Sequence, residues 1–387
     1  MPDSPLPITQ FINRPGIVDL AWGHPDPNLL PVRGLRQAAD RVFDRYGPEA
    51  LNYGFAAGPG PLISRVCDRL GEVDARSPSP DSVAISAGNS HALDQLATLL
   101  TDPGDVVLVE APTYHLAVRI LRDHPLELLP VPTDDGGLRL DALADILAQL
   151  RQRQRSVRFL YTVPTFHNPT GTSLATDRRE QLVQFAESAE LLIVEDDAYR
   201  ELAYDGPAPP SLWTLARPGT VVRLGSFAKS LAPGLRVGFI TADRPLISRI
   251  RDSGVLDSGG GISHFSSLVV AEFMDSGDYA RNVEQLRDAY RRRRDSLLAA
   301  LTEQLADRAS WRRPAGGYFV WLTLPQGQDA ASYIDAAERE GTSYMPGATF
   351  YLGGGEGRAN LRLAFSRYPS DLLAEAARRL ARALGGR

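Results

Sequence analysis

Short apolar runs alternate with longer amphipathic stretches between about residues 80 and 241 of the chain. The apolar runs are nearly continuous, which is typical of parallel strands covered on both faces of a sheet. They lie at 82–88, 105–112, 126–132, 157–164, 191–199, 221–227 and 235–241. Amphipathic stretches between several of them predict helices at 89–100, 139–153 and 176–190. This alternation predicts an α/β domain built on a mostly parallel sheet of seven strands.

The pattern changes after about residue 265. A long helical stretch is followed by two short apolar runs, at 318–325 and 360–366, and then by a closing amphipathic helix at 370–384. This order predicts a second, smaller α+β domain. We expect a large domain at 49–279, and a small domain formed by 1–48 and 280–387, with an N-terminal segment that reaches the substrate.

Composition and charge narrow the class of protein. The chain has 387 residues, 43% of them hydrophobic, and a formal net charge of -5, as in ordinary globular proteins and unlike a nucleic-acid-binding surface. The run Arg291–Arg294 lies in a predicted helix and is interpreted as a solvated face. The single cysteine, Cys67, excludes an internal disulfide and fits a reducing compartment. With no signal-peptide pattern and no apolar run of about 18 residues, we expect a cytoplasmic protein without membrane or nucleic-acid partners.

Lys229 is the only lysine in the chain, whereas 41 of the 42 basic residues are arginines. A guanidinium stays protonated at any accessible pH, but an amine can lose its proton, act as a nucleophile and form a Schiff base. The count alone also fits chance in an arginine-rich sequence. The surroundings of Lys229 therefore decide between the two interpretations.

Polar residues follow the carboxyl ends of the predicted strands, which is where open α/β sheets bind ligands. Each could serve as an ordinary turn, cap or packing residue when taken alone. In chain order they are Gly88, Asn89, Ser90, Tyr114, Asn168, Asp196, Tyr199, Ser226, Lys229 and Arg236. Together they supply a helix N-terminus for a phosphate, an aromatic plate, hydrogen-bond donors, a carboxylate and a Schiff-base lysine. Pyridoxal 5'-phosphate (PLP) requires this set, and the sequence predicts no metal site.

Motifs along nearly the whole chain resemble the class I/II aminotransferases, which are PLP enzymes of fold type I. The matching segments are "LAWGHPDPNLLP", "LNYGFAAGPGPL", "NPTG", "DDAY", "SFAKSLAPGLRVG", "RPAGGYFVWLTLP", "YMPGATFY" and "NLRLAFS". The sequence is most similar to the branch that contains 2-aminoadipate and aromatic aminotransferases and the effector domains of MocR-type regulators. The resemblance implies an aspartate aminotransferase-like fold and a homodimer with active sites at the subunit interface.

The resemblance also implies roles for individual residues around the cofactor. Lys229 would bind PLP and move the α-proton of the substrate, while Asp196 would pair with the ring nitrogen, since the family's Asp-x-x-Tyr spacing selects it over Asp197. Asn168 and Tyr199 would donate hydrogen bonds to the ring oxygen, and Tyr114 would stack on the ring. The implied phosphate ligands are Gly88, Asn89, Ser90, Ser226 and Arg236.

Substrate contacts follow from the same resemblance. Arg362 would bind the α-carboxylate of the substrate with two parallel hydrogen bonds. Gly23 and His24 lie in the segment that approaches the substrate, and Asn168 would face the substrate as well as the cofactor. Tyr53 matches the tyrosine that reaches across the dimer interface to the phosphate of the partner subunit.

Three functions stay open at this point. The leading one is an aminotransferase that moves an amino group between an α-amino acid and a 2-oxo acid. The second is a PLP enzyme of secondary metabolism that eliminates, cyclises or oxidises its amino acid. This alternative is motivated by the run Gly259–Gly261 and by four histidines that lie in or beside the family motifs. These are His24, His91, His167 and His264. The third, a non-catalytic effector-binding domain, is the least favoured, because only about 20 residues precede "LAWGHP".

Overall fold

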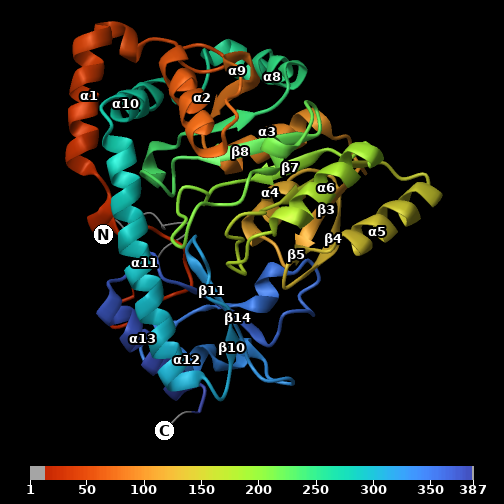
Figure 1. Ribbon diagram of the computed structural model, residues 1–387, viewed down its shortest axis with the longest axis vertical. Helices are drawn as coiled ribbons and strands as arrows, with labels where there is room; N and C mark the ends of the chain where they lie inside the picture. Colours follow the sequence, from red (N-terminus) through yellow and green to blue (C-terminus); the bar gives the residue numbers. More distant parts are fainter. Residues whose placement is uncertain (1–13, 386–387) are drawn as a thin grey trace, which may run out of the picture.

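The computed structural model describes residues 14–385, so the first 13 residues of the expected N-terminal segment lie outside the described part. A large α/β region and a smaller α+β region lie at opposite ends of the view in Figure 1. The long helix α11 (Asp278–Leu305) runs from one to the other. Its first turns share a hydrophobic cluster with the large region, through Tyr279 and Val283. Later turns, with Leu297 and Leu301, belong to the core of the small region.

The large region contains a sheet of eight strands. Their spatial order is β2 (Val83–Ser86), β9 (Gly238–Thr241), β8 (Val221–Ser226), β7 (Ile193–Asp196), β6 (Val157–Thr162), β3 (Val106–Ala111), β4 (Glu127–Asp134) and β5 (Gly137–Leu138). Neighbours from β8 to β4 pair in parallel, while β9 and β5 pair antiparallel with theirs. All seven predicted strands are present, which confirms the mostly parallel sheet. The structure adds β5, whose two residues are too few for a hydrophobic pattern to reveal.

Helices cover both faces of this sheet, which explains why its strands are nearly continuous apolar runs. On one face, α3 (Asn89–Leu100), α4 (His115–Arg122) and α8 (Arg244–Arg251) contribute to one buried cluster with Val107, Val109 and Phe159. On the other, α5 (Leu140–Gln152), α6 (Thr176–Ala189) and the short α7 (Leu212–Leu215) pack around Leu108 and Leu160. The predicted helices at 89–100, 139–153 and 176–190 correspond to α3, α5 and α6 within one residue at each end.

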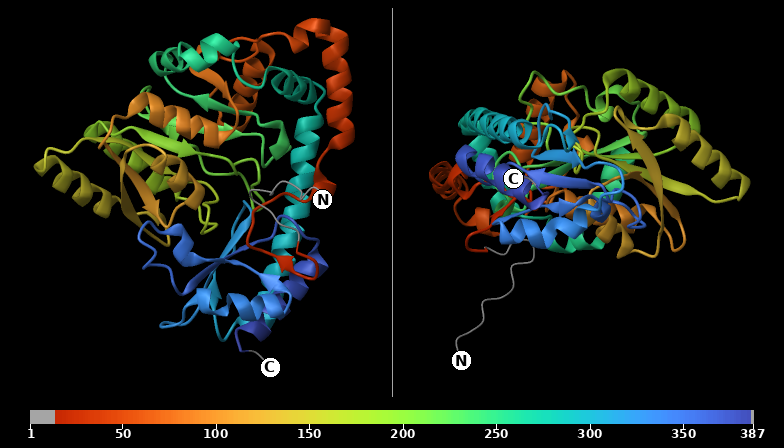
Figure 2. Two further views of the ribbon diagram at one scale, coloured as in Figure 1. Left: turned by 180° about the vertical axis from the view of Figure 1, so that it is seen from behind. Right: turned by 90° about the horizontal axis from the view of Figure 1, so that it is seen from below.

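The small region is an antiparallel sheet covered by helices. Its strands, in spatial order, are β10 (Ser310–Trp311), β11 (Phe319–Thr323), β14 (Asn360–Ala364) and β13 (Met345–Pro346), accompanied by α12 (Ile334–Arg339) and α13 (Ser370–Ala383). Figure 2 shows from behind how these C-terminal elements gather around the end of α11. The predicted strands and closing helix of this region are β11, β14 and α13.

The N-terminal segment contacts both regions. Strand β1 (Val18–Asp19) pairs in parallel with β12 (Thr342–Ser343) of the small region. Helix α1 (Val32–Tyr46) instead packs against α10 (His264–Asp275), which also packs against α2 (Gly60–Asp74). The short helix α9 (Gly254–Gly259) precedes α10 and lies beside α8 in Figure 1. Between β1 and α1, residues 20–31 cross from one region to the other. The division at residue 48 stays a prediction.

Candidate active site

One cavity of about 420 Å³ lies at the carboxyl ends of the parallel strands, between the sheet, the N-terminal crossing segment and the small region. Every predicted cofactor or substrate residue except Tyr53 lines it. These are Gly23, His24, Gly88, Asn89, Ser90, Tyr114, Asn168, Asp196, Tyr199, Ser226, Lys229, Arg236 and Arg362. Residues up to 340 positions apart in the chain therefore meet at one site.

Lys229 reaches this cavity from the turn that follows β8. Its Nζ donates a hydrogen bond to the carbonyl of Gly23 over 3.1 Å and lies 5.6 Å from the ring centre of Tyr318. The Tyr318 hydroxyl in turn donates to the carbonyl of Lys229, which holds the backbone of the turn. Burial, helped by the positive charge of Arg362, lowers the pKa of Lys229 to about 8. A substantial neutral, nucleophilic fraction of this amine is therefore present near physiological pH.

Asp196 is the last residue of β7, and its carboxylate is fixed by two neutral donors. The Tyr161 hydroxyl donates to Oδ2 over 2.8 Å, and the side-chain amide of Asn89 donates to Oδ1. Burial raises the pKa of Asp196, whereas the hydrogen bonds from Tyr161 and Asn89 lower it. The result is an oriented carboxylate that can face a cationic group in the cavity.

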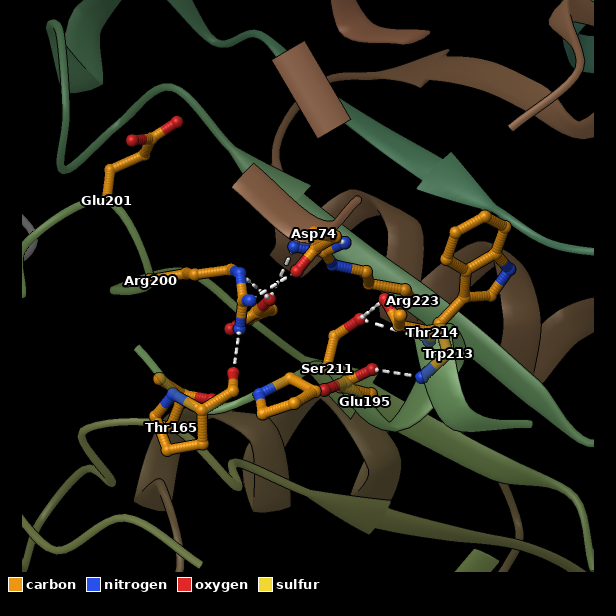
Figure 3. A network of polar contacts seen from close by, with 12 residues as sticks. Asp74, Thr165, Glu195, Arg200, Glu201, Ser211, Trp213, Thr214 and Arg223 are labelled. Carbon is orange, nitrogen blue, oxygen red and sulfur yellow. Dashed lines mark hydrogen bonds and ion pairs between the residues drawn. The ribbon is translucent and has the colours of Figure 1, made fainter. Parts of the chain in front are cut away.

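Asp197, the neighbour of Asp196, faces away from the cavity. Its Oδ2 lies 2.7 Å from Nη2 of Arg223, inside a buried cluster in which Asp74 pairs with both Arg223 and Arg200 (Figure 3). Because successive strand residues point to opposite faces, only one of the two acids can line the cavity. Of the two, Asp196 lines the cavity.

The start of α3 forms a cradle for an anion. Gly88 precedes the helix with φ of +92°, a conformation that favours glycine. A Cβ there would lie 3.1 Å from Nη2 of Arg236, so glycine lets this guanidinium approach the helix N-terminus. The Arg236 guanidinium donates to the carbonyl of Ala87, and Ser226 accepts from the N–H of Ala228. Free N–H groups of a first helical turn beside a cation suit a phosphate.

Arg362 on β14 brings a second cation to the opposite side of the cavity. Its Nη1 donates to Oδ1 of Asn168 over 2.7 Å, and its Nη2 donates to the carbonyl of Ala21. The guanidinium lies between the rings of Phe319 and Phe350, at 4.2 and 4.7 Å from their centres. Burial lowers the pKa of Arg362 to about 10, so it stays cationic at neutral pH. Its buried Nε has no partner in the described part of the chain and can donate a hydrogen bond to a carboxylate.

Two tyrosines complete the wall around Asn168. Tyr199 is buried and forms a hydrogen bond with Asn168, and Tyr114 lies beside the cavity at the start of α4. Burial raises the pKa of Tyr114 to about 12, which keeps its hydroxyl protonated. Both phenols can therefore donate hydrogen bonds or pack against a flat ring.

Several residues in or beside the cavity were not predicted from the sequence. His115 and Phe319 line the cavity, Phe350 packs against Arg362, and Tyr161 on β6 donates a hydrogen bond to Asp196. Tyr161 reads as an ordinary core residue of an apolar run, so no sequence signal marks it. His115 directly follows the predicted Tyr114 at a strand end, and that position is the one signal that could have identified it.

Of the histidines singled out by sequence, only His24 is among the residues that line the cavity. His167 is buried, with Nε2 3.2 Å from Oε2 of Glu110 and Nδ1 2.9 Å from the Thr170 hydroxyl, so it braces the turn that carries Asn168. His264 begins α10 and packs against Gly54, while His91 lies on α3.

Tyr53 lies outside the cavity. It is 81% exposed, and its neighbours Leu51 and Phe55 are 70% and 69% exposed. The segment is held by backbone packing: Gly261 has φ of +90°, and a Cβ there would lie 2.1 Å from the carbonyl oxygen of Phe55. The protein thus presents a row of large apolar side chains to solvent in a well-supported conformation.

Comparisons with known proteins agree on one family. The family described as aminotransferase class I and II matches residues 15–380. The chain is 36% identical to the 2-aminoadipate transaminase of Thermus thermophilus, with 98% of this chain and 93% of the relative covered. It is 31% identical to aromatic-amino-acid aminotransferase 1 of Thermococcus litoralis, over 97% and 89%. A structure of Pyrococcus horikoshii kynurenine aminotransferase with PMP superimposes with a TM-score of 0.90 at 33% identity, covering 96% of this chain and 91% of that one.

Proposed function

The chain belongs to the class I and II aminotransferases and is a PLP-dependent transferase that moves an amino group between an α-amino acid and a 2-oxo acid, and we propose that it does so with the cavity described above, on amino acids with aromatic side chains. The observation that carries this assignment is the convergence of Lys229, Asp196, Arg236 and Arg362 on a single cavity.

The cavity residues fit PLP. Lys229 would bind the aldehyde, and the buried Asp196 carboxylate would hold the ring nitrogen protonated. The cradle at Gly88, with Ser90, Ser226 and Arg236, would bind the phosphate. Because the side chain of Asn89 donates to Asp196, Asn89 would reach the phosphate through its backbone N–H alone. Asn168 and Tyr199 would hydrogen-bond the ring oxygen, and Tyr114 would lie against the ring.

When bound, PLP withdraws electrons from the α-carbon of an amino acid, and the remaining tasks belong to the chain. Arg362 would bind and orient the α-carboxylate; Asn168 and the Ala21 carbonyl engage two of its five N–H groups, which leaves donors for the substrate. Lys229 would move the proton at the α-carbon as a general base. The aromatic walls around Arg362 exclude water and strengthen its interaction with the carboxylate.

The charges and rings of the cavity support an aromatic substrate. Among the described lining residues the cations are Lys229, Arg236 and Arg362, all of which have roles already. A second substrate carboxylate would therefore be desolvated without a counter-charge from this chain, which is unfavourable. Trp22, His24 and Phe319 instead offer flat surfaces at this end. Of the substrates named for the relatives, this cavity favours the aromatic amino acids over 2-aminoadipate.

The half-reaction tests this substrate class without any acceptor. PLP-loaded protein is mixed with phenylalanine or with 2-aminoadipate, and the spectral change of the cofactor is followed by stopped flow. We expect the second-order rate constant for phenylalanine to exceed that for 2-aminoadipate by at least about tenfold, since a tenfold ratio requires only 1.4 kcal/mol. An equal or faster reaction with 2-aminoadipate contradicts the proposed substrate class.

We also propose that the working unit is a homodimer in which Tyr53 of each subunit contacts the phosphate in the other. The exposed Leu51, Tyr53 and Phe55 support this, and Val255 on the adjacent α9 is 72% exposed. Contiguous apolar surface of this kind marks a protein interface. A second copy is the occupant that the resemblance predicts.

Complementation between two inactive variants tests the dimer. A Tyr53→Ala/Lys229→Ala heterodimer contains one site with both defects and one with neither, so activity should reappear after the variants are unfolded and refolded together. Recovery should approach one wild-type site per heterodimer, provided that Tyr53→Ala alone is first shown to be badly impaired. The matched control pairs Lys229→Ala with Lys229→Arg, which leaves no intact site. A verified heterodimer that stays inactive shows that each site is built within one chain.

The cellular compartment is a further proposal. We propose a cytoplasmic enzyme, supported by the single cysteine, Cys67, which is buried and reduced. Within residues 14–385, no helix is both long and apolar enough to cross a membrane.

A further inference from the structure

His115 occupies the substrate end of the cavity inside a box of aromatic rings. It is the first residue of α4, directly after Tyr114, and it lines the cavity together with Trp22. The ring centres of Trp22, Tyr114 and Phe350 lie 6.5, 5.7 and 5.2 Å from that of His115, with the Tyr114 and Phe350 rings near-perpendicular to it. Rings on several sides fix the orientation of the imidazole.

This imidazole is a polar group without a polar partner. Its Nδ1 is buried and has no hydrogen-bond partner among residues 14–385. Burial lowers the pKa of His115 to about 4, and the positive charges of Arg362 and Arg119 act in the same direction. The ring is therefore neutral at physiological pH, with one nitrogen as a donor and the other as an acceptor. Because Nδ1 is closed off from the cavity, Nε2 is the ring nitrogen that a ligand in the cavity can reach, and it can donate to or accept from a neutral polar group.

We propose that His115 is a specificity-determining residue that forms a hydrogen bond with an uncharged polar substituent on the aromatic side chain of the substrate. The chemical class is an aromatic amino acid that carries a hydroxyl, amino or carbonyl group. This inference rests on the proposed function, because it requires that an aromatic side chain extends from Arg362 into the ring box.

The geometry favours a neutral substituent over a charged one. A carboxylate beside His115 would lose its hydration against an imidazole that burial keeps neutral, while Arg362 is already occupied by the α-carboxylate. A cationic substituent would find only one acidic side chain among the described lining residues, Asp196, which is held by Tyr161 and Asn89 at the other end of the cavity. A neutral hydroxyl meets neither obstacle.

Binding of unreactive carboxylates tests this without turnover. Dissociation constants for PLP-loaded protein are measured by calorimetry with 3-phenylpropionate, with its 3-hydroxy and 4-hydroxy ring derivatives, and with 3-(4-carboxyphenyl)propionate. Each has a carboxylate for Arg362 and lacks the amine needed for reaction. We expect the better hydroxylated ligand to bind about three- to tenfold more tightly than 3-phenylpropionate, and the dicarboxylate to bind more weakly than both.

Variants at position 115 assign the preference to the ring nitrogens. His115→Phe keeps the flat ring and removes the hydrogen bond, so the preference for the hydroxylated ligand should fall to within about twofold. His115→Gln places an amide nitrogen or oxygen near the position of Nε2 and should retain part of the preference, which separates hydrogen bonding from a general disturbance of the site. The control is His124→Phe, because His124 pairs with Asp94 outside the cavity; this variant should keep the wild-type preference.

The outcomes separate this inference from the function on which it rests. An undiminished preference in folded His115→Phe, no hydroxyl preference in the wild type, or tightest binding of the dicarboxylate overturns the role of His115. Failure of every aromatic carboxylate to bind the wild-type protein overturns the aromatic substrate class, and the inference with it. If His115→Phe does not fold, His115→Gln decides the matter: complete loss of the preference for the hydroxylated ligand over 3-phenylpropionate in this variant contradicts the proposal.

Discussion

Lys229→Ala should abolish turnover and remove the visible absorbance band of the lysine-bound cofactor from the purified protein. Lys229 is the only lysine in the chain, so no neighbouring amine can replace it. Its Nζ lies inside the cavity, where it donates a hydrogen bond to the Gly23 carbonyl. The 41 arginines cannot supply the same chemistry, because a guanidinium does not become a nucleophile. We expect the rate to fall by at least about four orders of magnitude, in line with the removal of a principal catalytic group.

Lys229→Arg is the matched control for this result. It keeps the positive charge and much of the side-chain length, so a role for Lys229 as a cation alone would leave the variant partly active. We expect it to be as inactive as Lys229→Ala. A visible band of covalently bound cofactor in either variant, free of added amines, contradicts the assignment of Lys229.

Asp196→Asn should lose about 10- to 1,000-fold in activity per cofactor-loaded site. A carboxylate near the ring nitrogen of the cofactor shifts the pKa of that nitrogen upward by about 1–3 units, and an amide has no comparable field. Tyr161 and Asn89 remain as neutral partners of the substituted side chain, so the fold around it should persist. The rate constant of the half-reaction and the cofactor content, measured on the same preparation, separate the loss of chemistry from the loss of binding.

Asp197→Asn is the control, and its effect should differ in kind. Asp197 pairs with Arg223 in the buried cluster that also contains Asp74 and Arg200, away from the cavity. Removal of its charge should lower the thermal stability, because one partner of a buried charged pair is left uncompensated. Activity per folded, loaded site should change far less than in Asp196→Asn. Equal losses of activity per site, or a greater loss at Asp197, would show that the choice between the two aspartates is wrong.

Most of the fold could be predicted because its strands are buried on both faces. Continuous apolar runs such as 105–112 and 157–164 leave a strong signal, and the ends of α3, α5 and α6 follow from amphipathic periodicity. The two-residue strand β5 leaves no such signal. The placement of α1 against α10 depends on contacts between residues far apart in the chain, which periodicity does not specify.

The cofactor end of the site could be predicted better than the substrate end. Asp196 and Lys229 follow strand termini, whose convergence is a property of every open parallel sheet. The environment of His115 is different, because Trp22 and Phe350 reach it from segments 93 residues before and 235 residues after it in the chain. The role of Tyr161 could not be predicted because this residue lies within a buried, mostly apolar strand, where nothing in the sequence distinguishes it from a core residue. The substrate end thus depends on packing between distant segments, whereas the cofactor end depends on strand-end positions that the fold class already defines.

The fate of an isotopic label tests the central claim most directly. PLP-loaded protein is incubated with ¹⁵N-phenylalanine and an unlabelled 2-oxo acid, and the products are identified by mass spectrometry. Transfer of the amino group predicts that ¹⁵N appears in the amino acid derived from the oxo acid, in equal amount to the phenylpyruvate formed, and that turnover stops after one equivalent per site when the oxo acid is omitted. Sustained consumption of phenylalanine without an oxo acid, with ¹⁵N released as ammonia, would contradict the account.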